Sequence, residues 1–435
     1  MSSHAQSDLP IYDVIGVGFG PSNIGLAIAL HEKRAQGRRL ETLFIEKQPA
    51  FTWHRDMLLD NSSMQISFLK DLATLRDPTS RFTFINYLHE KGRLQDFINL
   101  KTFFPSRHEF NDYFAWAASH FEDQCRYGEE VFEVVPENRG GMVDLVRVRS
   151  RLRNGAVRER LTRNLVLSIG GAANIPEEFA PFWEDGRIFH SNTYLSGVNR
   201  NANASKMAVI GAGQSAAEIF LDLHGRPNAP QLDLVMRARA IKPSDDSPFV
   251  NQIFDVDFVD QVYRRSQDER NDLLREFRHT NYSGPDMALI EQIYQLLYQQ
   301  RVVNEERHRF FRQHVVRDVR PSADGVHLDL LDLDTENVTS VRYDAVVLAT
   351  GYQRQQHKEL LAPLTPYLQN FAVSRHYRLK TTPQFQPGIF LQGACEGTHG
   401  LSDTLLSVTA ARTAEIGEAL LAATSSVTRQ DAVPA

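Results

Sequence analysis

Two apolar runs in this chain each break into a glycine-rich turn and continue with helical spacing. The first unit spans Tyr12–Asn23 (YDVIGVGFGPSN) and the second spans Lys206–Glu218 (KMAVIGAGQSAAE). A strand, a glycine turn and a helix N-terminus form a cradle for phosphate, because the turn lets the backbone approach and the first helical N–H groups face the anion. One Gly-x-Gly turn is a moderate signal. Two such units predict an α/β fold with two Rossmann-like dinucleotide-binding domains.

The first unit is followed by an acidic residue where an adenosine ribose would bind. Gly16, Gly18 and Gly20 form the turn, with the third glycine one place earlier than in G-x-G-x-x-G. Glu41–Glu46 (ETLFIE) is predicted as the next strand, and Glu46 at its end can bind ribose hydroxyls. The alternative is a surface glutamate in solvent. The order of strand, turn, helix, strand and acid favours the ribose role.

The second unit ends in arginine where the first ends in glutamate. Its next strand is predicted over Leu232–Met236, with Arg237 directly after it and Arg239 two residues later. An acid in this place selects an unmodified ribose, whereas arginine can bind a 2′-phosphate. The sequence therefore predicts NADPH rather than NADH, the alternative being a solvated arginine at a strand end.

The remaining chain is arranged around these two units. Helical, amphipathic spacing fills most of segment 242–310 and predicts a small helical insertion. Asp344–Gly351 (DAVVLATG) is predicted as a strand that returns the chain to the first domain, and Asp403–Ala422 as a helix. The predicted division is a first domain over 1–195, a second over 196–335 with the insertion at about 242–310, and a return to the first domain over 336–435.

Composition excludes several classes of function. A net charge of −6 argues against a general nucleic-acid binder. The two cysteines, Cys125 and Cys395, form no C-x-x-C pair, so a dithiol shuttle is excluded and we expect no metal site. No apolar run approaches the ~20 residues that span a bilayer, and the N-terminus lacks the apolar core of a signal peptide. We expect a cytoplasmic protein without a membrane segment.

A long irregular stretch, Phe51–Asp77, follows the first unit. It is rich in aromatic, Met and polar residues, and such a long irregular stretch in a globular chain is usually functional or disordered. Its apolar content argues against disorder. Lys70 lies between Leu69 and Asp71 within it. From the residues alone, Lys70 is interpreted as a snorkelling or ion-paired lysine.

Motifs along nearly the whole chain, from Asp13 to about Ala414, carry a resemblance to one enzyme family. The chain resembles the class B flavin-dependent N-hydroxylating monooxygenases, and in particular the L-ornithine N-hydroxylases of siderophore synthesis, of the pyoverdine type. The spacing of Gly186, His190 and Tyr194 is similar to the wider class B fingerprint. The motifs that carry the resemblance are GVGFGPSNIGLAIAL, FTWHRDM, MQISFLKDLATLRDPTS, FINLKTFFPSRHEFNDY, GAGQSAAE, KPSDDSPFVNQIF, HTNYS, LATGY and HGLSDTLLS.

The resemblance implies FAD in the first cradle, NADPH in the second and a substrate amino acid beside the helical insertion. Lys70 would then bind the substrate carboxylate, which replaces its interpretation as a snorkelling residue. The implied catalytic residues are Gln65, Lys70 and Asn281. The implied substrate-binding residues are Lys70, Asn251, Gln252, Ile253, Phe254, Asn281 and Ser407. The implied cofactor-binding residues are Gly16, Gly18, Gly20, Glu46, Lys47, Trp53, His54, Met64, Gln65, Val131, Ala212, Gly213, Gln214, Ser215, Arg237, Asn281, Ser283, Thr404, Leu405 and Leu406.

The implied reaction is N-hydroxylation of the side-chain amine of L-ornithine by dioxygen through a flavin hydroperoxide, after NADPH reduces FAD. The attacking amine must be neutral, and removing its proton near pH 7.4 costs about 4 kcal/mol for a pKa of about 10.4. A neighbouring carboxylate would raise that cost, so we expect no Asp or Glu to contact the reacting nitrogen.

Two alternatives to ornithine hydroxylation stay open. L-Lysine or a diamine could be the substrate, because one methylene is worth only ~1–3 kcal/mol in a pocket. A non-catalytic flavin-binding protein is the other alternative. The resemblance also implies a homo-oligomer, with a tetramer suspected.

Overall fold

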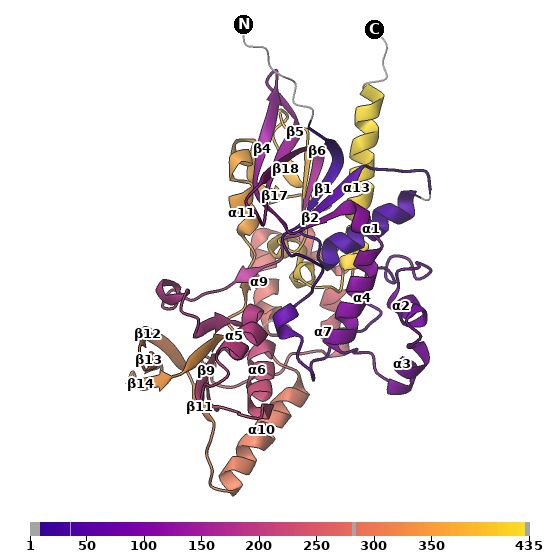
Figure 1. Cartoon of the computed structure of the whole chain (residues 1–435). Coiled ribbons are helices and arrows are strands. Elements are labelled where there is room, and N and C mark those ends of the chain that lie inside the picture. The colour runs from indigo at the N-terminus through magenta and orange to yellow at the C-terminus, as the bar shows by residue number, and fades with distance from the viewer. Residues whose placement is uncertain (1–8, 35, 281–283, 431–435) are drawn as a thin grey trace.

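Two sheets with parallel strands hold the two predicted cradles at the carboxyl ends of β1 and β9. The computed structural model describes residues 9–34, 36–280 and 284–430. The sheet that contains β1 (Ile11–Val17) lies in the upper half of Figure 1, and β9 (Lys206–Ile210) lies in the lower half.

The first sheet has seven strands in the order β3-β2-β1-β6-β5-β4, with β19 paired to β6. Its parallel strands besides β1 are β2 (Thr42–Glu46), β3 (Cys125–Tyr127), β6 (Val157–Leu167) and β19 (Gly388–Leu391). Its antiparallel strands are β4 (Glu129–Arg139) and β5 (Met142–Leu152). Pairing of Ile15 with Leu43 and Leu165 places β1 between two buried apolar strands, as its sequence predicts.

Helices cover this sheet and build an aromatic core beside it. Helix α1 (Pro21–Arg34) starts with proline at its first position, and it contacts α13 (Thr409–Gln430), which runs beside it in Figure 1. Helix α4 (Arg107–Ser119) is capped by Ser106, whose hydroxyl accepts from the Glu109 N–H at 3.1 Å. The neighbouring helices are α2 (Phe84–Glu90) and α3 (Leu94–Leu100).

The second sheet has five parallel strands in the order β11-β10-β9-β15-β8. The strands beside β9 are β8 (Ile188–His190), β10 (Gln231–Met236), β11 (Arg309–Arg312) and β15 (Ala345–Leu348). The helices of this half include α5 (Tyr194–Arg200) and α6 (Gln214–Gly225). A three-stranded antiparallel sheet packs against it through a buried cluster that includes Val235, Val319 and Leu328. That sheet consists of β12 (His314–Ser322), β13 (Gly325–Asp332) and β14 (Val338–Tyr343).

A group of helices lies between β10 and β11, in the segment where the helical insertion was expected. It consists of α7 (Pro248–Asn251), α8 (Phe258–Tyr263), α9 (Gln267–Glu276) and α10 (Met287–Val302). Ser266 and Glu269 form a capping box at the start of α9, in which each side chain bonds the other residue's backbone N–H. Local sequence therefore specifies where this helix begins.

The two chain crossings between the sheets lie side by side. Strand β7 (Ala172–Ala173) pairs antiparallel with β16 (Tyr352–Gln353). The adjoining Asn174 bonds Thr350 in both directions, since its Nδ2 donates to the Thr350 carbonyl at 3.1 Å and its carbonyl accepts from the Thr350 hydroxyl at 2.5 Å. This short ribbon joins the two halves of the molecule.

The strand pairings differ from the expected segments at both crossings. We expected Asp344–Gly351 to return the chain to the first sheet, but β15 pairs with β9 and β8 in the second. Strand β8 likewise belongs to the second sheet although it precedes residue 195. An apolar run such as Ala345–Leu348 predicts a strand buried on both faces, and it carries no information about which parallel sheet contains it.

The last helix also differs from its prediction. We expected a helix over Asp403–Ala422, but residues Leu401–Thr404 form a single 3-10 turn and α13 begins at Thr409. The Asp403 carboxylate accepts from the Cys395 N–H at 2.6 Å and from the guanidinium of Arg412 at 3.1 Å. These buried bonds hold the segment before α13 outside the helix. The remaining elements of this region are α11 (Gln356–Leu360), β17 (Leu368–Val373), β18 (Leu379–Thr381) and α12 (Glu396–His399).

Candidate active site

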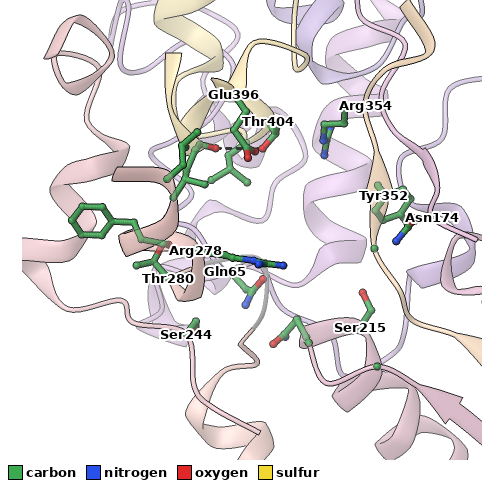
Figure 2. A pocket seen from close by; sticks show the side chains of 18 of the residues that line it. Gln65, Asn174, Ser215, Ser244, Arg278, Thr280, Tyr352, Arg354, Glu396 and Thr404 are labelled. Carbon is green, nitrogen blue, oxygen red and sulfur yellow. Dashed lines mark hydrogen bonds between the residues drawn. The ribbon is translucent and has the colours of Figure 1, made fainter. Parts of the chain in front are cut away.

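One large cavity lies between the halves of the molecule and is lined by both. Its volume is about 3670 Å³, several times the ~300–1,000 Å³ typical of a site for one small ligand. Figure 2 shows side chains that line it, among them Gln65, Ser215, Arg354 and Thr404. A cavity of this size has room for two dinucleotides and a small substrate.

Most of the residues predicted for the site line this cavity. They are Trp53, His54, Met64, Gln65, Lys70, Ala212, Gly213, Gln214, Ser215, Arg237, Asn251, Gln252, Phe254, Thr404, Leu405, Leu406 and Ser407. The predicted residues that are not part of its lining are Gly16, Gly18, Gly20, Glu46, Lys47, Val131 and Ile253. Asn281 and Ser283 lie outside the described residues, so their predicted roles stay predictions.

The first cradle lies at the carboxyl ends of β1 and β2. Gly18 has a φ of 81°, and a Cβ on it would lie 2.5 Å from the Ser168 carbonyl oxygen, so this turn requires glycine. The Glu46 carboxylate accepts from the Phe19 N–H and the Gln48 N–H, each at 2.8 Å. These bonds hold the carboxylate against the turn, which fits its predicted place beside a ribose.

The wall on the FAD side is built from the irregular stretch after β2. The backbone N–H of Trp53 donates to the side-chain oxygen of Asn111 at 2.9 Å. The Trp53 ring packs edge to face against Phe114, with 5.2 Å between the ring centres. Met64 is buried, and its N–H donates to the Pro105 carbonyl at 2.8 Å. This stretch has no regular helix, yet tertiary bonds fix its course along the cavity.

His54 is a neutral imidazole on this wall. Its side chain is open to the cavity, but the protein around it and the guanidinium groups of Arg107 and Arg354 lower its pKa to about 4. Near pH 7 the ring can therefore donate and accept hydrogen bonds without adding charge.

The second cradle lies where β9 turns into α6. Gly211 has a φ of 144°, and a Cβ on it would lie 2.4 Å from the Ala349 carbonyl oxygen. Gly213 is the N-cap of α6 and brings no side chain to the helix start, so the first helical N–H groups face the cavity with the positive end of the helix dipole. Arg237 and Arg239 follow β10 and are exposed in the cavity wall. This arrangement fits a phosphorylated nucleotide.

The end of the cavity that is predicted to hold the substrate contains Lys70 and the segment before α8. The ammonium of Lys70 lies 6.0 Å from the centre of the Phe254 ring. Burial lowers the pKa of Lys70, and the carboxylate of Asp255 opposes that shift. Ser407 is buried in the same lining, whereas Ile253 packs with Phe254 and Leu401 in a small apolar cluster.

Carboxylates also belong to the lining, and Glu396 is the clearest example. Burial raises the pKa of Glu396, and the guanidinium of Arg354 opposes that shift. Both side chains are labelled in Figure 2. The expectation that no carboxylate contacts the reacting nitrogen stays a prediction.

A buried ion pair fixes the segment that carries Thr404, Leu405 and Leu406. Arg412 on α13 donates to the Asp403 carboxylate at 3.1 Å and to the Ser22 hydroxyl on α1 at 2.9 Å. Both members of the pair are almost fully buried, with side-chain exposures of 1% and 0%. Sequence reasoning missed this pair because a lone arginine in a helical pattern reads as a surface residue.

Sequence reasoning also missed the polar contacts that join the two halves across the cavity. Arg107 donates to both oxygens of Glu218 on α6, at 2.7 and 2.8 Å. Asp286 accepts from Gln65 at 3.1 Å and from Gln214 at 3.2 Å. The motif GAGQSAAE contains two of these residues, so its polar positions were the available signal.

Two kinds of feature were searched for in the described residues without a result. Within residues 9–34, 36–280 and 284–430, no group of three or more His, Cys, Asp or Glu side chains could hold a metal ion. None of the helices in the same ranges is long and apolar enough to cross a bilayer.

The chain is similar to known proteins along most of its length. The family model for L-lysine 6-monooxygenase/L-ornithine 5-monooxygenase matches residues 10–354. The chain is 48% identical over 422 residues to the L-ornithine N(5)-monooxygenase of Pseudomonas aeruginosa, a match that covers 96% of this chain and 95% of that protein.

Solved structures are also similar to this chain over nearly its whole length. An ornithine hydroxylase from Pseudomonas aeruginosa is similar with a TM-score of 0.92 and 49% identity, over 95% of this chain and 100% of that one. The ornithine N-hydroxylase of Kutzneria sp. 744, with reduced FAD, NADP⁺ and L-ornithine, is similar with a TM-score of 0.89 and 37% identity, over 97% of this chain and 100% of that one.

Proposed function

This chain belongs to the L-lysine 6-monooxygenase/L-ornithine 5-monooxygenase family, and from that premise we propose that it N-hydroxylates the side-chain amine of L-ornithine with FAD, NADPH and dioxygen. The observation that carries the proposal is the large cavity that the second cradle shares with Lys70 and with Trp53, His54 and Gln65 of the stretch that follows the first cradle. The product, N5-hydroxy-L-ornithine, is a building block of hydroxamates that bind iron. We assign this product to siderophore synthesis.

The residues around the cavity fit both cofactors. The turns at Gly18 and Gly211 both require glycine, because a Cβ at either position would clash with a backbone carbonyl oxygen. Glu46 suits an unmodified ribose, and Arg237 suits a 2′-phosphate. Bound FAD supplies the redox chemistry, in which it accepts a hydride from NADPH and activates dioxygen.

Lys70 anchors the substrate by its acid end in this proposal. A bound carboxylate would offset the burial that lowers the pKa of Lys70. Asn251 and Ser407 complete that end of the pocket. The amine then lies toward the flavin side. We expect no unpaired carboxylate to contact it there, because a carboxylate would hold its proton.

Exclusion of water is the second task of the cavity wall. Met64 and Phe254 are buried apolar side chains in the lining, and Leu405 and Leu406 add partly buried ones. A dry wall strengthens the polar interactions inside the site and protects reactive species from water. Gln65, Trp53 and His54 place polar groups beside the flavin.

Two finer statements belong to the same proposal. We place the enzyme in the cytoplasm, where NADPH is supplied. We also propose a homo-oligomer, with a tetramer as the expected state, which sedimentation of the FAD-loaded protein measures directly.

Product analysis tests the proposed reaction. The FAD-loaded protein is incubated with NADPH, air and separate samples of L-ornithine, L-lysine and 1,4-diaminobutane. We expect one oxygen atom to be added to ornithine, read as a mass increase and a positive hydroxylamine assay. Lysine should react at least about tenfold less efficiently, since a mismatch of one methylene is worth ~1–3 kcal/mol. The diamine should also react at least about tenfold less efficiently, because it lacks the carboxylate that Lys70 binds in this proposal. NADPH consumption without oxidation of any amine nitrogen would overturn the proposal.

A further inference from the structure

Asp286 contacts one predicted residue of each cofactor site. It lies directly before α10 (Met287–Val302), at the cavity wall. Its Oδ1 accepts from Nε2 of Gln65 at 3.1 Å, and its Oδ2 accepts from Nε2 of Gln214 at 3.2 Å. The three residues come from the FAD side, the α6 cradle and the helical insertion. One carboxylate therefore joins three separate parts of the site.

The carboxylate of Asp286 is not used to cap its own helix. Asp286 is the N-cap of α10, a position where aspartate usually accepts from the first backbone N–H groups. No such bond is formed here, whereas Thr83, Ser106 and Ser266 do cap their helices in this way. The side chain is committed to the two glutamines instead.

This arrangement fixes which way each glutamine amide points. A carboxylate accepts hydrogen bonds only, so the NH₂ groups of Gln65 and Gln214 must both face Asp286. The Gln214 amide is held at both ends, because its NH₂ also donates to Glu218 at 2.7 Å and its oxygen accepts from the Asp286 N–H at 2.9 Å. The oxygen of Gln65 is thereby turned away from Asp286.

We propose that Asp286 is a positioning residue that orients Gln65 toward the flavin and Gln214 toward the nicotinamide nucleotide, so that both cofactor sites depend on one carboxylate. This inference rests on the proposed function, which assigns Gln65 and Gln214 to those cofactors. Asparagine at position 286 has one acceptor oxygen and one NH₂ group. Its oxygen can accept from the NH₂ group of one glutamine. The NH₂ group of the other glutamine would face the NH₂ group of the asparagine, so that glutamine amide would have to rotate.

The binding of NADP⁺ to the oxidised, FAD-loaded protein tests the proposal without turnover. The titration follows the visible absorption of the flavin, which responds when a nucleotide binds beside it. We expect Asp286→Asn to weaken NADP⁺ by about tenfold, the effect of losing one charge-assisted hydrogen bond. Asp286→Glu keeps both acceptor oxygens and should recover part of the affinity. Unchanged NADP⁺ affinity in Asp286→Asn would overturn the proposal.

Asp257 offers a matched control. It is also an N-cap aspartate, at the start of α8 (Phe258–Tyr263), and it likewise makes no side-chain capping bond. Asp257→Asn should leave NADP⁺ affinity unchanged within about twofold. An equal loss in both variants would mean that the effect comes from the helix start, and would contradict a role through the glutamines.

A double-mutant cycle identifies the path of the effect. In a Gln214→Ala background, Asp286→Asn should change NADP⁺ affinity by less than about threefold, because the amide that it orients is absent. A full tenfold loss in that background would show that Asp286 acts by another route. These titrations need no amine substrate, so a failure of ornithine hydroxylation would leave their outcome readable and would count against the proposed function alone.

Discussion

Lys70 is the residue for which local sequence and family resemblance imply the most different roles. On sequence alone it resembles a lysine that extends its ammonium to solvent. In the structure it is half-buried in the cavity, and burial lowers its pKa while Asp255 opposes the shift. A partly desolvated cation that faces a cavity is a natural partner for an anionic group of a substrate.

The first prediction concerns this cation. Lys70→Met keeps most of the side-chain volume and removes the charge. Loss of one partner of a buried ion pair costs at least ~2 kcal/mol, so KM for L-ornithine should rise about 30-fold or more. Steady-state hydroxylation measures KM, and the rate of flavin reduction by NADPH should stay within twofold of the parent.

1,4-Diaminobutane serves as the control substrate because it has no carboxylate. Its hydroxylation should change little in Lys70→Met. An equal loss for ornithine and the diamine would mean that Lys70 does not bind the acid end.

His308 is a second residue with a strongly shifted proton equilibrium, away from the cavity. Its Nδ1 accepts from the Leu232 N–H at 3.1 Å, so the neutral ring carries its proton on Nε2, 3.0 Å from Nδ1 of His224. Burial, with His224 and Arg307, lowers its pKa to about 4, against a small opposing effect of Asp233.

The second prediction follows from the sign of that shift. The unfolded chain binds a proton at His308 between pH 6.5 and 4 and the folded chain does not, so stability falls as pH falls through this window, by up to ~3 kcal/mol. His308→Asn keeps an acceptor for the Leu232 N–H but cannot titrate. The free energy of unfolding, measured with urea, should be higher for the parent than for the variant at pH 7. This difference should shrink as the pH falls toward 4. A pH-independent difference between the two proteins would contradict this account.

At the residue scale, sequence can propose a role where one residue type has one common use. The ribose and phosphate roles of Glu46 and Arg237 come from the usual meaning of an acid or an arginine after the second strand of a nucleotide fold, and both stay predictions. Asp286 was missed because aspartate before a helix is normally read as a cap. The purpose of its side chain depends on glutamines 221 and 72 positions away in the chain.

At the scale of one element, the turn between β9 and α6 determines the shape of the second cradle. Gly211 has a φ of 144°, which residues other than glycine rarely adopt. The carbonyl oxygen of Ala349, directly after β15, lies 2.4 Å from the position that a Cβ on Gly211 would take. The strand, the turn and the helix start are therefore one unit.

The third prediction tests this unit. Gly211→Ala should weaken NADP⁺ about tenfold or more, since a strained backbone position costs ~1–3 kcal/mol and a shifted turn misplaces the helix N–H groups. FAD content should be unchanged, because the first cradle belongs to another sheet. Calorimetric titration of NADP⁺ measures the effect.

Gly225 at the end of α6 provides a matched control, because a Cβ there meets no atom within 4 Å. Gly225→Ala should bind NADP⁺ like the parent. If Gly211→Ala did so too, the turn would not be the phosphate cradle.

Elements were predictable where their determinants are close in sequence. The strand, glycine turn and helix of both cradles follow from residues within about a dozen positions. The start of α13 at Thr409 did not follow, because buried Arg412 draws Asp403 out of a helical pattern that local periodicity favours. Long-range burial decided that boundary.

At the scale of the whole molecule, Arg107 and Glu218 connect the two halves. The side chains are 14% and 6% exposed, and both terminal guanidinium nitrogens bond the carboxylate. Burial raises the pKa of Glu218, and Arg107 opposes that rise. The pair links α4 of the FAD side to α6 of the NADPH side.

The fourth prediction removes one partner. Arg107→Met leaves the Glu218 carboxylate buried and unpaired and should destabilise the protein by ~3–5 kcal/mol. Thermal unfolding monitored by circular dichroism measures the decrease in Tm relative to the parent. The exposed pair of Arg320 and Asp329 on β12 and β13 is the comparison, and Arg320→Met should cost less than ~1 kcal/mol. Similar losses in both variants would mean that the interdomain pair is no stronger than a surface one.

The association of the two halves was beyond sequence reasoning. Arg107 and Glu218 are separated by 111 positions, and neither motif that contains them indicates the other. The division at 195 and 336 failed to anticipate that β8 and β15 complete the second sheet. The ion pair and the strand pairings both depend on packing between segments that are far apart in the sequence, and local patterns do not report such packing.

The short ribbon of β7 and β16 makes residues 174–351 a cassette. This stretch leaves and rejoins the rest of the chain through two strands that are hydrogen-bonded to each other, so its ends are neighbours. A segment with neighbouring ends can be exchanged between relatives through one junction, as in domain insertion. The coenzyme preference proposed for Arg237 and the proposed helical side of the amine pocket would then be inherited together, while the half that contains β1 stays with the recipient.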